Sequence, residues 1–311
     1  MANDFMQISD MVADALDVSD AEISDLLDSA PLVAALPMEE SSNGSTHKFS
    51  KETGAPVVGW RAENAGRDFD SSADTIVTAT LKILDFSWQV DKAVADAWRK
   101  GRENFVAREG LRHLKAALFS YEKQLIGGTV NGDASGFAGL ADSTGLDAAA
   151  DDMVVDAGGT TADTGSSVWG IRLGANDVTG VYKGDGPSLD LGETIVTNFV
   201  DGSSKNLPVY YTPACLWLGV QIGGARSVGR IASVTADAGA KLDDQNISDL
   251  ISKFPAGAGP THLVMSRRSL AQLQQSRTAT STTGAPAPFP QESFGVPIIT
   301  TDGQIDTEAL L

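Results

Sequence analysis

The sequence has one cysteine, Cys215, and only three histidines, His47, His113 and His262, in 311 residues. A single cysteine excludes a disulfide within the chain and is typical of a protein that folds in a reducing compartment. The histidines fall in three different segments, so we predict neither a multi-histidine metal site nor a Ser/His/Asp arrangement. We therefore expect no catalytic site, no cofactor and no metal, and Cys215 is predicted to be a buried, inert thiol.

Positive charge is also scarce. The chain has 23 Lys and Arg against 41 Asp and Glu, a formal net charge of −18, which disfavours proteins that bind nucleic acid by neutralising phosphates. No apolar run approaches the ~20 residues needed to cross a bilayer, and the first residues lack the basic start and apolar core of a signal peptide. We expect a soluble cytoplasmic product without a membrane partner.

The N-terminal segment is acidic and amphipathic. Apolar residues recur at three- and four-residue spacing over residues 8–16 and 23–30, which predicts two short helices that Pro31 and Pro37 end. Such helices are marginal alone. We expect their apolar faces to pack on another part of the fold or on a neighbouring subunit, with an ordinary terminal helix on its own domain as the alternative.

Residues 46–90 change to a β pattern. The clearest strands are residues 48–51 and 75–84, and the stretch between them is polar and rich in turn formers. A hairpin of this length has little apolar material to bury, so we predict that it projects from the body. Trp60 and Arg61 stand out in it. Either they contact a partner chain, or Trp60 packs locally against its own strand.

The strongest helix signal covers residues 91–126 and ends at Gly127 and Gly128. This stretch contains eight of the 23 cations, interspersed with five acids. Read by itself it resembles a nucleic-acid-binding helix. The interspersed acids favour a solvated face with intrahelical ion pairs instead.

The second half of the chain is rich in glycine and in β patterns. Residues 167–173 and 178–182 predict a β-hairpin, and further strands are expected at 207–211, 215–222 and 227–234. Helices are predicted at 244–254 and 267–276, with a short buried strand at 262–265 between them. Residues 131–136 with Asp142 have the outline of a calcium loop, but the match is incomplete and favours a structural turn.

Taken in order, these segments resemble the major capsid protein of tailed bacteriophages, with its Hong Kong 97-type fold. The resemblance is carried by four weak motifs, at residues 127–133 leading to 139–140, 167–174, 228–234 and 294–298. It implies an α+β fold in which residues 1–45 are the N-arm, 46–89 the extended E-loop and 90–130 the spine helix of the peripheral domain. Residues 131–311 would be the axial domain, with a β-rich elaboration at about 145–235 and returning peripheral-domain strands.

The resemblance also implies a function. The chain would be a non-enzymatic coat protein that self-assembles into an icosahedral shell of pentamers and hexamers around double-stranded DNA, in the virion, after assembly in the host cytoplasm. Because only ~45 residues precede the E-loop, a separate scaffolding protein is expected, besides a portal and weakly contacted DNA. Trp60, Arg61, Lys48 and Lys51 are candidate intersubunit contacts. Some members crosslink an E-loop lysine, but no matching context identifies a partner here.

Three alternatives stay open at this point. An encapsulin-like nanocompartment shell has the same fold but encloses protein cargo. A β-rich surface binding protein would account for the Gly-, Asp- and Thr-rich middle of the chain, although no signal peptide is evident. A hydrolase using scattered carboxylates is the least favoured.

Overall fold

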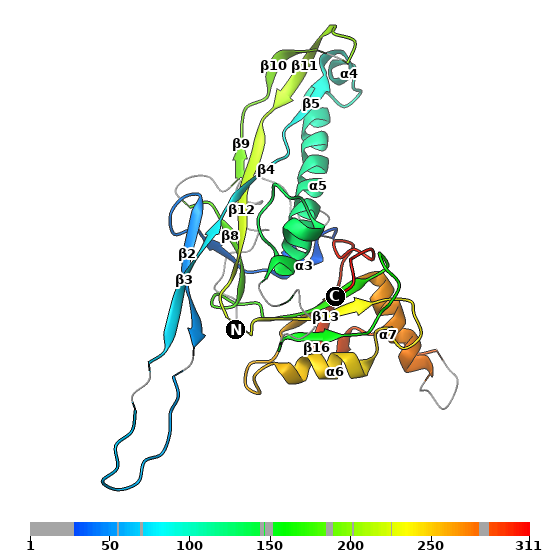
Figure 1. Cartoon of the computed structure of the whole chain (residues 1–311). Helices are drawn as coiled ribbons and strands as arrows, with labels where there is room; N and C mark the ends of the chain where they lie inside the picture. Colours follow the sequence, from blue (N-terminus) through cyan, green and yellow to red (C-terminus); the bar gives the residue numbers. More distant parts are fainter. Residues whose placement is uncertain are drawn as a thin grey trace.

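The computed structural model describes residues 28–54, 56–68, 71–143, 146, 152–184, 189–200, 202–224, 226–279 and 286–311. Figure 1 shows three parts: an arm built of a long helix and strands, a hairpin that points away from the arm, and a compact lobe. The two predicted N-terminal helices lie outside the described residues, except for residues 28–30, which form a turn.

The arm contains two helices and two sheets. Its helices are α4 (Lys92–Asp96) and α5 (Arg102–Asn131). One sheet has the order β1-β8-β12-β4, with β9 also paired to β12, and the other has the order β10-β11-β5. Their strands are β1 (Met38–Glu40), β4 (Lys82–Asp85), β5 (Trp88–Asp91), β8 (Val178–Tyr182), β9 (Leu189–Leu191), β10 (Ile195–Val200), β11 (Asn206–Thr212) and β12 (Ala214–Ile222).

The compact lobe is built on a six-stranded sheet in the order β15-β16-β14-β7-β13-β6. Its elements are β6 (Val154–Asp156), β7 (Ser166–Ile171), β13 (Val228–Val234), α6 (Asp244–Lys253), β14 (His262–Met265), α7 (Arg267–Ala279), β15 (Glu292–Ser293) and β16 (Val296–Thr300). Helix α6 packs closely on the sheet, because a Cβ on Gly229 of β13 would lie 2.8 Å from a methyl carbon of Leu250. The predicted helices and strand of residues 244–276 are confirmed.

The predicted long helix is interrupted near its start. Residues 97–101 separate α4 from α5, and Gly101, the residue before α5, has a φ of 95° that favours glycine. Trp98 and Phe105 face each other across this corner with ring centroids 5.2 Å apart. At the other end, Gly128 has a non-helical φ of 55°, so the regular helix does stop at the predicted glycine pair.

The predicted hairpin of residues 167–182 is wrong. β7 pairs with β13 and β14 in the lobe, whereas β8 pairs with β1 and β12 in the arm. Period-2 alternation marks a strand but does not select its partner, and both edges of β7 are already occupied. The stretch 145–235 thus contributes to three sheets, and the domain boundaries stay a prediction.

Two chain crossings between the arm and the lobe lie side by side. One joins β7 to β8 and the other joins β12 to β13, and Asp177 connects them. Its carboxylate binds Arg172 at 3.1 Å and accepts a hydrogen bond from the Ser227 hydroxyl at 2.6 Å. Its carbonyl oxygen accepts from the Gly223 amide at 2.8 Å. Asp177 therefore contacts both crossings, which are also joined by a hydrogen bond from the Arg172 amide to the Ser227 carbonyl oxygen at 2.9 Å.

A buried carboxylate joins three distant segments at the base of α5. Glu122 Oε2 accepts hydrogen bonds from the amides of Leu32 at 2.7 Å and Val33 at 3.1 Å. Its Oε1 bonds the hydroxyl of Thr301, in the loop after β16. The two amides belong to the first turn of α3 (Pro31–Ala35). Pro31 thus begins a helix, where its fixed φ and missing N–H are tolerated.

We predict that Glu122→Ala lowers the free energy of unfolding by about 3 kcal/mol, because two buried amides lose their acceptor. Glu122→Gln keeps one acceptor oxygen and should cost about 1 kcal/mol. Urea unfolding of both variants and the parent protein measures the difference. Equal losses for the two variants would contradict the role of the acceptor.

A pH dependence follows from the same residue. Burial, the largest influence, raises the pKa of Glu122 above its ordinary 4.5, although hydrogen bonds from Thr301, Val33 and Leu32 oppose the shift. The folded state thus holds this proton more tightly than the unfolded state, so stability falls as the pH rises from 4.5 through the raised pKa. Unfolding free energies measured from pH 4 to 8 should show this slope in the parent protein and not in Glu122→Gln.

Candidate assembly surfaces

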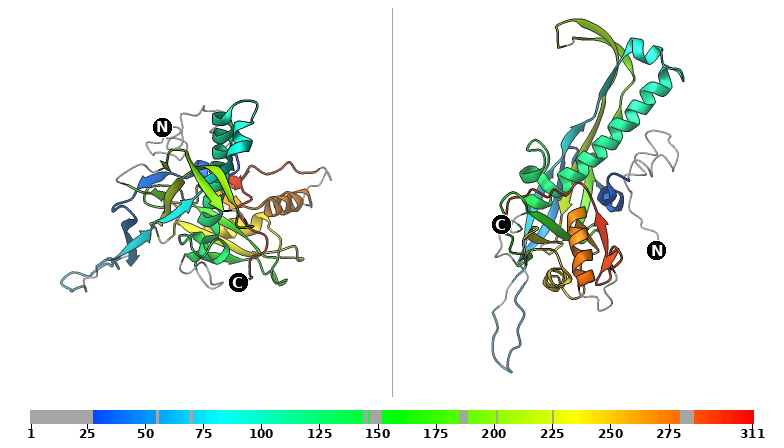
Figure 2. Two further views of the ribbon diagram at one scale, coloured as in Figure 1. Left: turned by 90° about the horizontal axis from the view of Figure 1, so that it is seen from above. Right: turned by 90° about the vertical axis from the view of Figure 1, so that its right-hand side faces the viewer.

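The projecting hairpin consists of β2 (Thr46–Gly54) and β3 (Ala73–Thr80), paired antiparallel. Its root is held by a buried histidine: His47 Nδ1 accepts from the Ser42 amide at 3.2 Å. The opposite ring nitrogen, Nε2, therefore donates to Gln221 Oε1 of β12, at 2.6 Å. The hairpin is anchored to the arm at one end, and its other end extends away from both arm and lobe (Figure 2).

The four candidate contact residues all lie in this hairpin. Trp60 is fully exposed, so the alternative of a local tuck against its own strand does not describe the structure. Arg61 donates to the carbonyl oxygen of Ala65 at 3.2 Å and stays exposed. Lys48 is exposed and Lys51 half-buried. Their contact with another subunit stays a prediction.

A second exposed apolar surface lies at the far end of the arm. Every residue of β10 is exposed, and this strand forms the edge of its sheet. The large apolar side chains of this surface are Val94, Ile195, Val196, Phe199 and Val200. An exposed apolar edge strand is a site at which another chain can pair or pack. Sequence patterns do not predict this strand, because the apolar residues of β10 come in adjacent pairs and do not alternate with polar ones.

Between α5 and the arm sheets lies an apolar groove of about 690 Å³. Phe86, Trp88 and Leu111 are among its lining residues. At its floor α5 comes very close to β5, because a Cβ on Gly110 would lie 2.8 Å from the indole of Trp88. Gly110 is thus required for close packing rather than for a bend.

The compact lobe has its own exposed aromatic side chains, Phe289 and Phe294. Phe294 and Gly295 form the turn between β15 and β16, both with positive φ, 52° and 77°. The turn therefore holds a phenylalanine in a left-handed conformation that bulky residues rarely adopt. Hairpin, arm and lobe each present a separate exposed apolar surface.

The cations of α5 are partly paired, as predicted. Glu109 binds Arg112 at 2.8 Å and Arg108 at 3.3 Å. Near the corner, Lys92 binds Asp96 at 2.6 Å, and the hydroxyl of Tyr210 donates to the same carboxylate at 3.0 Å. These groups are mostly exposed, so each pair contributes roughly 0.2–1 kcal/mol.

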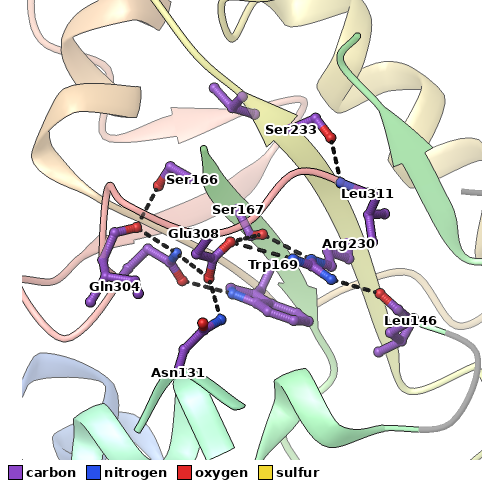
Figure 3. A network of polar contacts seen from close by, with 12 residues as sticks. Asn131, Leu146, Ser166, Ser167, Trp169, Arg230, Ser233, Gln304, Glu308 and Leu311 are labelled. Carbon is purple, nitrogen blue, oxygen red and sulfur yellow. Dashed lines mark hydrogen bonds and ion pairs between the residues drawn. The ribbon is translucent and has the colours of Figure 1, made fainter. Parts of the chain in front are cut away.

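Figure 3 shows a buried polar network at the C-terminal end of the chain, which sequence reasoning missed. Arg230 of β13 bonds Ser167 at 2.8 Å and forms a buried ion pair with Glu308 at 3.4 Å. Gln304 accepts a hydrogen bond from the indole of Trp169 at 2.9 Å. The network attaches the last residues to the lobe sheet, and such groups are separated by too much sequence for any local pattern to reveal them.

The described residues contain no group of three or more His, Cys, Asp or Glu placed to hold a metal ion. The calcium-like segment closes as a turn: Asp142 accepts from the amides of Thr129 at 2.7 Å and Gly139 at 2.8 Å. Cys215 is half-buried and not fully buried as predicted. This partial burial, with the nearby Asp190 and Asp85, raises the pKa of Cys215, which disfavours its thiolate. No helix in the described part of the chain is long and apolar enough to span a bilayer.

This architecture, with a projecting hairpin, a helix-backed arm and a compact lobe, is the Hong Kong 97-type fold of shell proteins. A chain in the structure of bacteriophage Epsilon15 matches with a TM-score of 0.61 and 18% identity, over 88% of this chain and 87% of that chain. The bacteriophage JBD30 capsid matches with a TM-score of 0.52 and 13% identity, over 94% of this chain and 97% of that chain. The predicted α+β fold class is confirmed.

The sequence gives the particular family. Residues 17–281 match the family described as major capsid protein GP7, and the chain belongs to that family. No curated protein matches the chain. The predicted function as a major capsid protein of a bacteriophage is thereby confirmed, and the family match favours it over the nanocompartment and surface-binding alternatives.

We predict that Gly110→Ala destabilises the subunit by about 2 kcal/mol, because the added methyl group overlaps the Trp88 indole. The change removes a helical glycine, which by itself would stabilise by up to about 1 kcal/mol. The exposed Ala116→Gly is the matched control and should cost about 1 kcal/mol from helix propensity alone. Unfolding of both is followed by Trp fluorescence; a stabilised Gly110→Ala variant would contradict the close packing.

Proposed function

We propose that this coat protein builds an icosahedral shell of pentamers and hexamers, with each subunit contacting its neighbours through the hairpin, the far end of the arm and the rim of the lobe. The observation that carries the proposal is the hairpin, in which Trp60 is fully exposed at a tip that packs on no described part of the chain. Large exposed apolar surface on a soluble chain indicates an interface. Closed shells need several such surfaces in each subunit.

In this proposal each region predicted from the sequence has a role in the shell. Residues 46–89 act as the E-loop that reaches a neighbour, and Lys48, Lys51, Trp60 and Arg61 are its contact residues. Residues 90–130 act as the spine helix of the peripheral domain, and residues 131–311 as the axial domain, with the β-rich elaboration at about 145–235 and returning peripheral-domain strands. The first 45 residues form the N-arm. The family supports a structural role, and we propose that the chain has no enzymatic activity of its own.

The proposed partners follow from the charge and the family. A separate scaffolding protein and a portal direct assembly in the host cytoplasm, and the finished shell lies in the virion. The packaged double-stranded DNA is contacted weakly and without sequence preference, because a chain with a net charge of −18 repels phosphates over most of its surface.

The test compares Trp60→Ala with Val130→Ala, a matched exposed apolar residue outside the three surfaces. Both variants should unfold within about 0.5 kcal/mol of the parent, since neither side chain is buried in the subunit. Trp60→Ala should lose closed particles, because a central aromatic anchor contributes roughly 2 kcal/mol or more at each contact. Circular dichroism, light scattering and negative-stain microscopy measure these outcomes. Closed particles from Trp60→Ala at the parent's yield would refute the hairpin contact.

A further inference from the structure

Helix α5 has a side that turns away from the arm sheets, which we call the spine face. Its residues recur at spacings of three and four, and they are Phe105, Arg108, Arg112, Lys115 and Phe119. Different positions of the helix, among them Gly110 and Leu114, line the groove on the sheet side. In Figure 2 the arm sheets lie along one side of α5. On the other side, Pro31 of α3 and Thr300 of β16 approach the spine face at Lys115 and Phe119.

The spine face combines aromatic surface with positive charge. Phe105 and Phe119 are half-buried, and the Arg108 guanidinium lies over the rings of Trp98 at 4.4 Å and Phe105 at 5.3 Å. Glu109 is shared by the two arginines, and the side chain of Arg112 remains 62% exposed. An amphipathic segment with acidic residues would complement this surface in both respects.

The chain itself contains such a segment. Residues 1–27 carry seven Asp and Glu and no Lys or Arg, with apolar residues at helical spacing. They lie outside the described residues, which begin at Asp28. Asp28 lines a hollow of about 410 Å³ together with Lys115 and Phe119. The N-terminal segment therefore meets the described structure at one end of the spine face.

The length of the N-terminal segment also fits the length of the spine face. Phe105 and Phe119 are 14 residues apart on α5, so the spine face is about 21 Å long at 1.5 Å per residue. A segment of 27 residues would reach about 40 Å as a continuous helix and still covers the face as two shorter helices. Its length is therefore sufficient to reach the whole spine face of its own chain.

We propose that residues 1–27 bind the spine face of their own chain in the unassembled subunit, with their acids on Arg108, Arg112 and Lys115. Apolar side chains such as Val12 and Leu16 pack on the exposed edges of the phenylalanine rings. The segment thereby covers a basic part of an acidic chain and keeps polyanions such as DNA from adhering to it. This inference concerns the free subunit and does not rest on shell formation.

The contact is tested directly on full-length subunit, diluted until light scattering shows a monomer. Spin labels are placed at Ser19→Cys and Ala116→Cys in a Cys215→Ser background, and pulsed EPR measures the distance between them. We expect a single narrow distribution of label-to-label distances, centred at a short distance. The distribution should broaden in the variant Asp10→Asn/Asp14→Asn/Asp17→Asn, and also in the parent at 1 M salt. A broad distribution in the parent, or a dipolar signal between singly labelled chains in a mixture, would overturn the proposal.

The covering effect is tested by fluorescence anisotropy with duplex DNA. The three-acid variant should bind DNA more tightly than the parent and lose about 40-fold more affinity between 50 and 200 mM salt, as three uncovered cations predict. Adding Arg108→Gln/Arg112→Gln/Lys115→Gln to it removes these three cations and should restore the parent's weak binding. A deletion of residues 1–27 provides a second variant with the same expected direction.

The matched control removes the same charge elsewhere on the surface. Asp163→Asn/Asp190→Asn/Glu193→Gln changes three exposed acids that are distant from α5 in sequence. It should bind DNA as weakly as the parent. If it binds as tightly as the three-acid variant, net charge alone explains the effect and the proposed cover fails. Particle formation by these variants is measured separately, so failure of this proposal and failure of shell assembly are distinguishable.

Discussion

The carboxylate of Glu122 is the interaction on which the arrangement of the whole subunit depends. It is fully buried, and it holds the first turn of α3 and the loop after β16 against α5. The preceding residue, Tyr121, connects α5 to the arm sheet, because its hydroxyl donates to the carbonyl oxygen of Gly219 in β12 at 3.1 Å. Two adjacent residues of one helix thus connect the N-terminal segment, the arm sheet and the lobe, and a buried acceptor of this kind cannot be removed without leaving amides unsatisfied.

Because the centre of the subunit is held together by these contacts, it can carry projecting elements that would not be stable alone. The hairpin β2–β3 is a two-stranded ribbon, which is marginal in water unless its ends are held, and it is held by the buried pair of His47 and Gln221. The edge strand β10 exposes apolar side chains on both faces. Neither element has enough surface to bury within the subunit. Their apolar side chains are therefore available for contacts between subunits, which is the role expected of a capsid protein.

Much of the fold could be predicted from local patterns, and what could not be predicted depends on distant partners. Periodicity located α5, α6 and α7 and the projecting hairpin, because each is determined by residues close in sequence. The choice of β13 and β14 as partners of β7 is a tertiary property that alternation does not encode. The same holds for Arg230 and Glu308, 78 residues apart. For the candidate surfaces, Trp60 could be singled out as the tryptophan of a polar stretch, whereas β10 could not.

Charge and apolar surface have separate roles in this subunit. Residues 91–126 hold eight cations and five acids, so the rest of the chain holds 15 cations and 36 acids. Exposed ion pairs of α5 contribute little and are screened by salt over about 8–10 Å, so they cannot supply the free energy of a closed shell. That energy has to come from the apolar side chains that the hairpin, arm and lobe leave exposed. Charge then decides which surfaces may approach one another, because cations are concentrated in a few helices of an otherwise acidic chain.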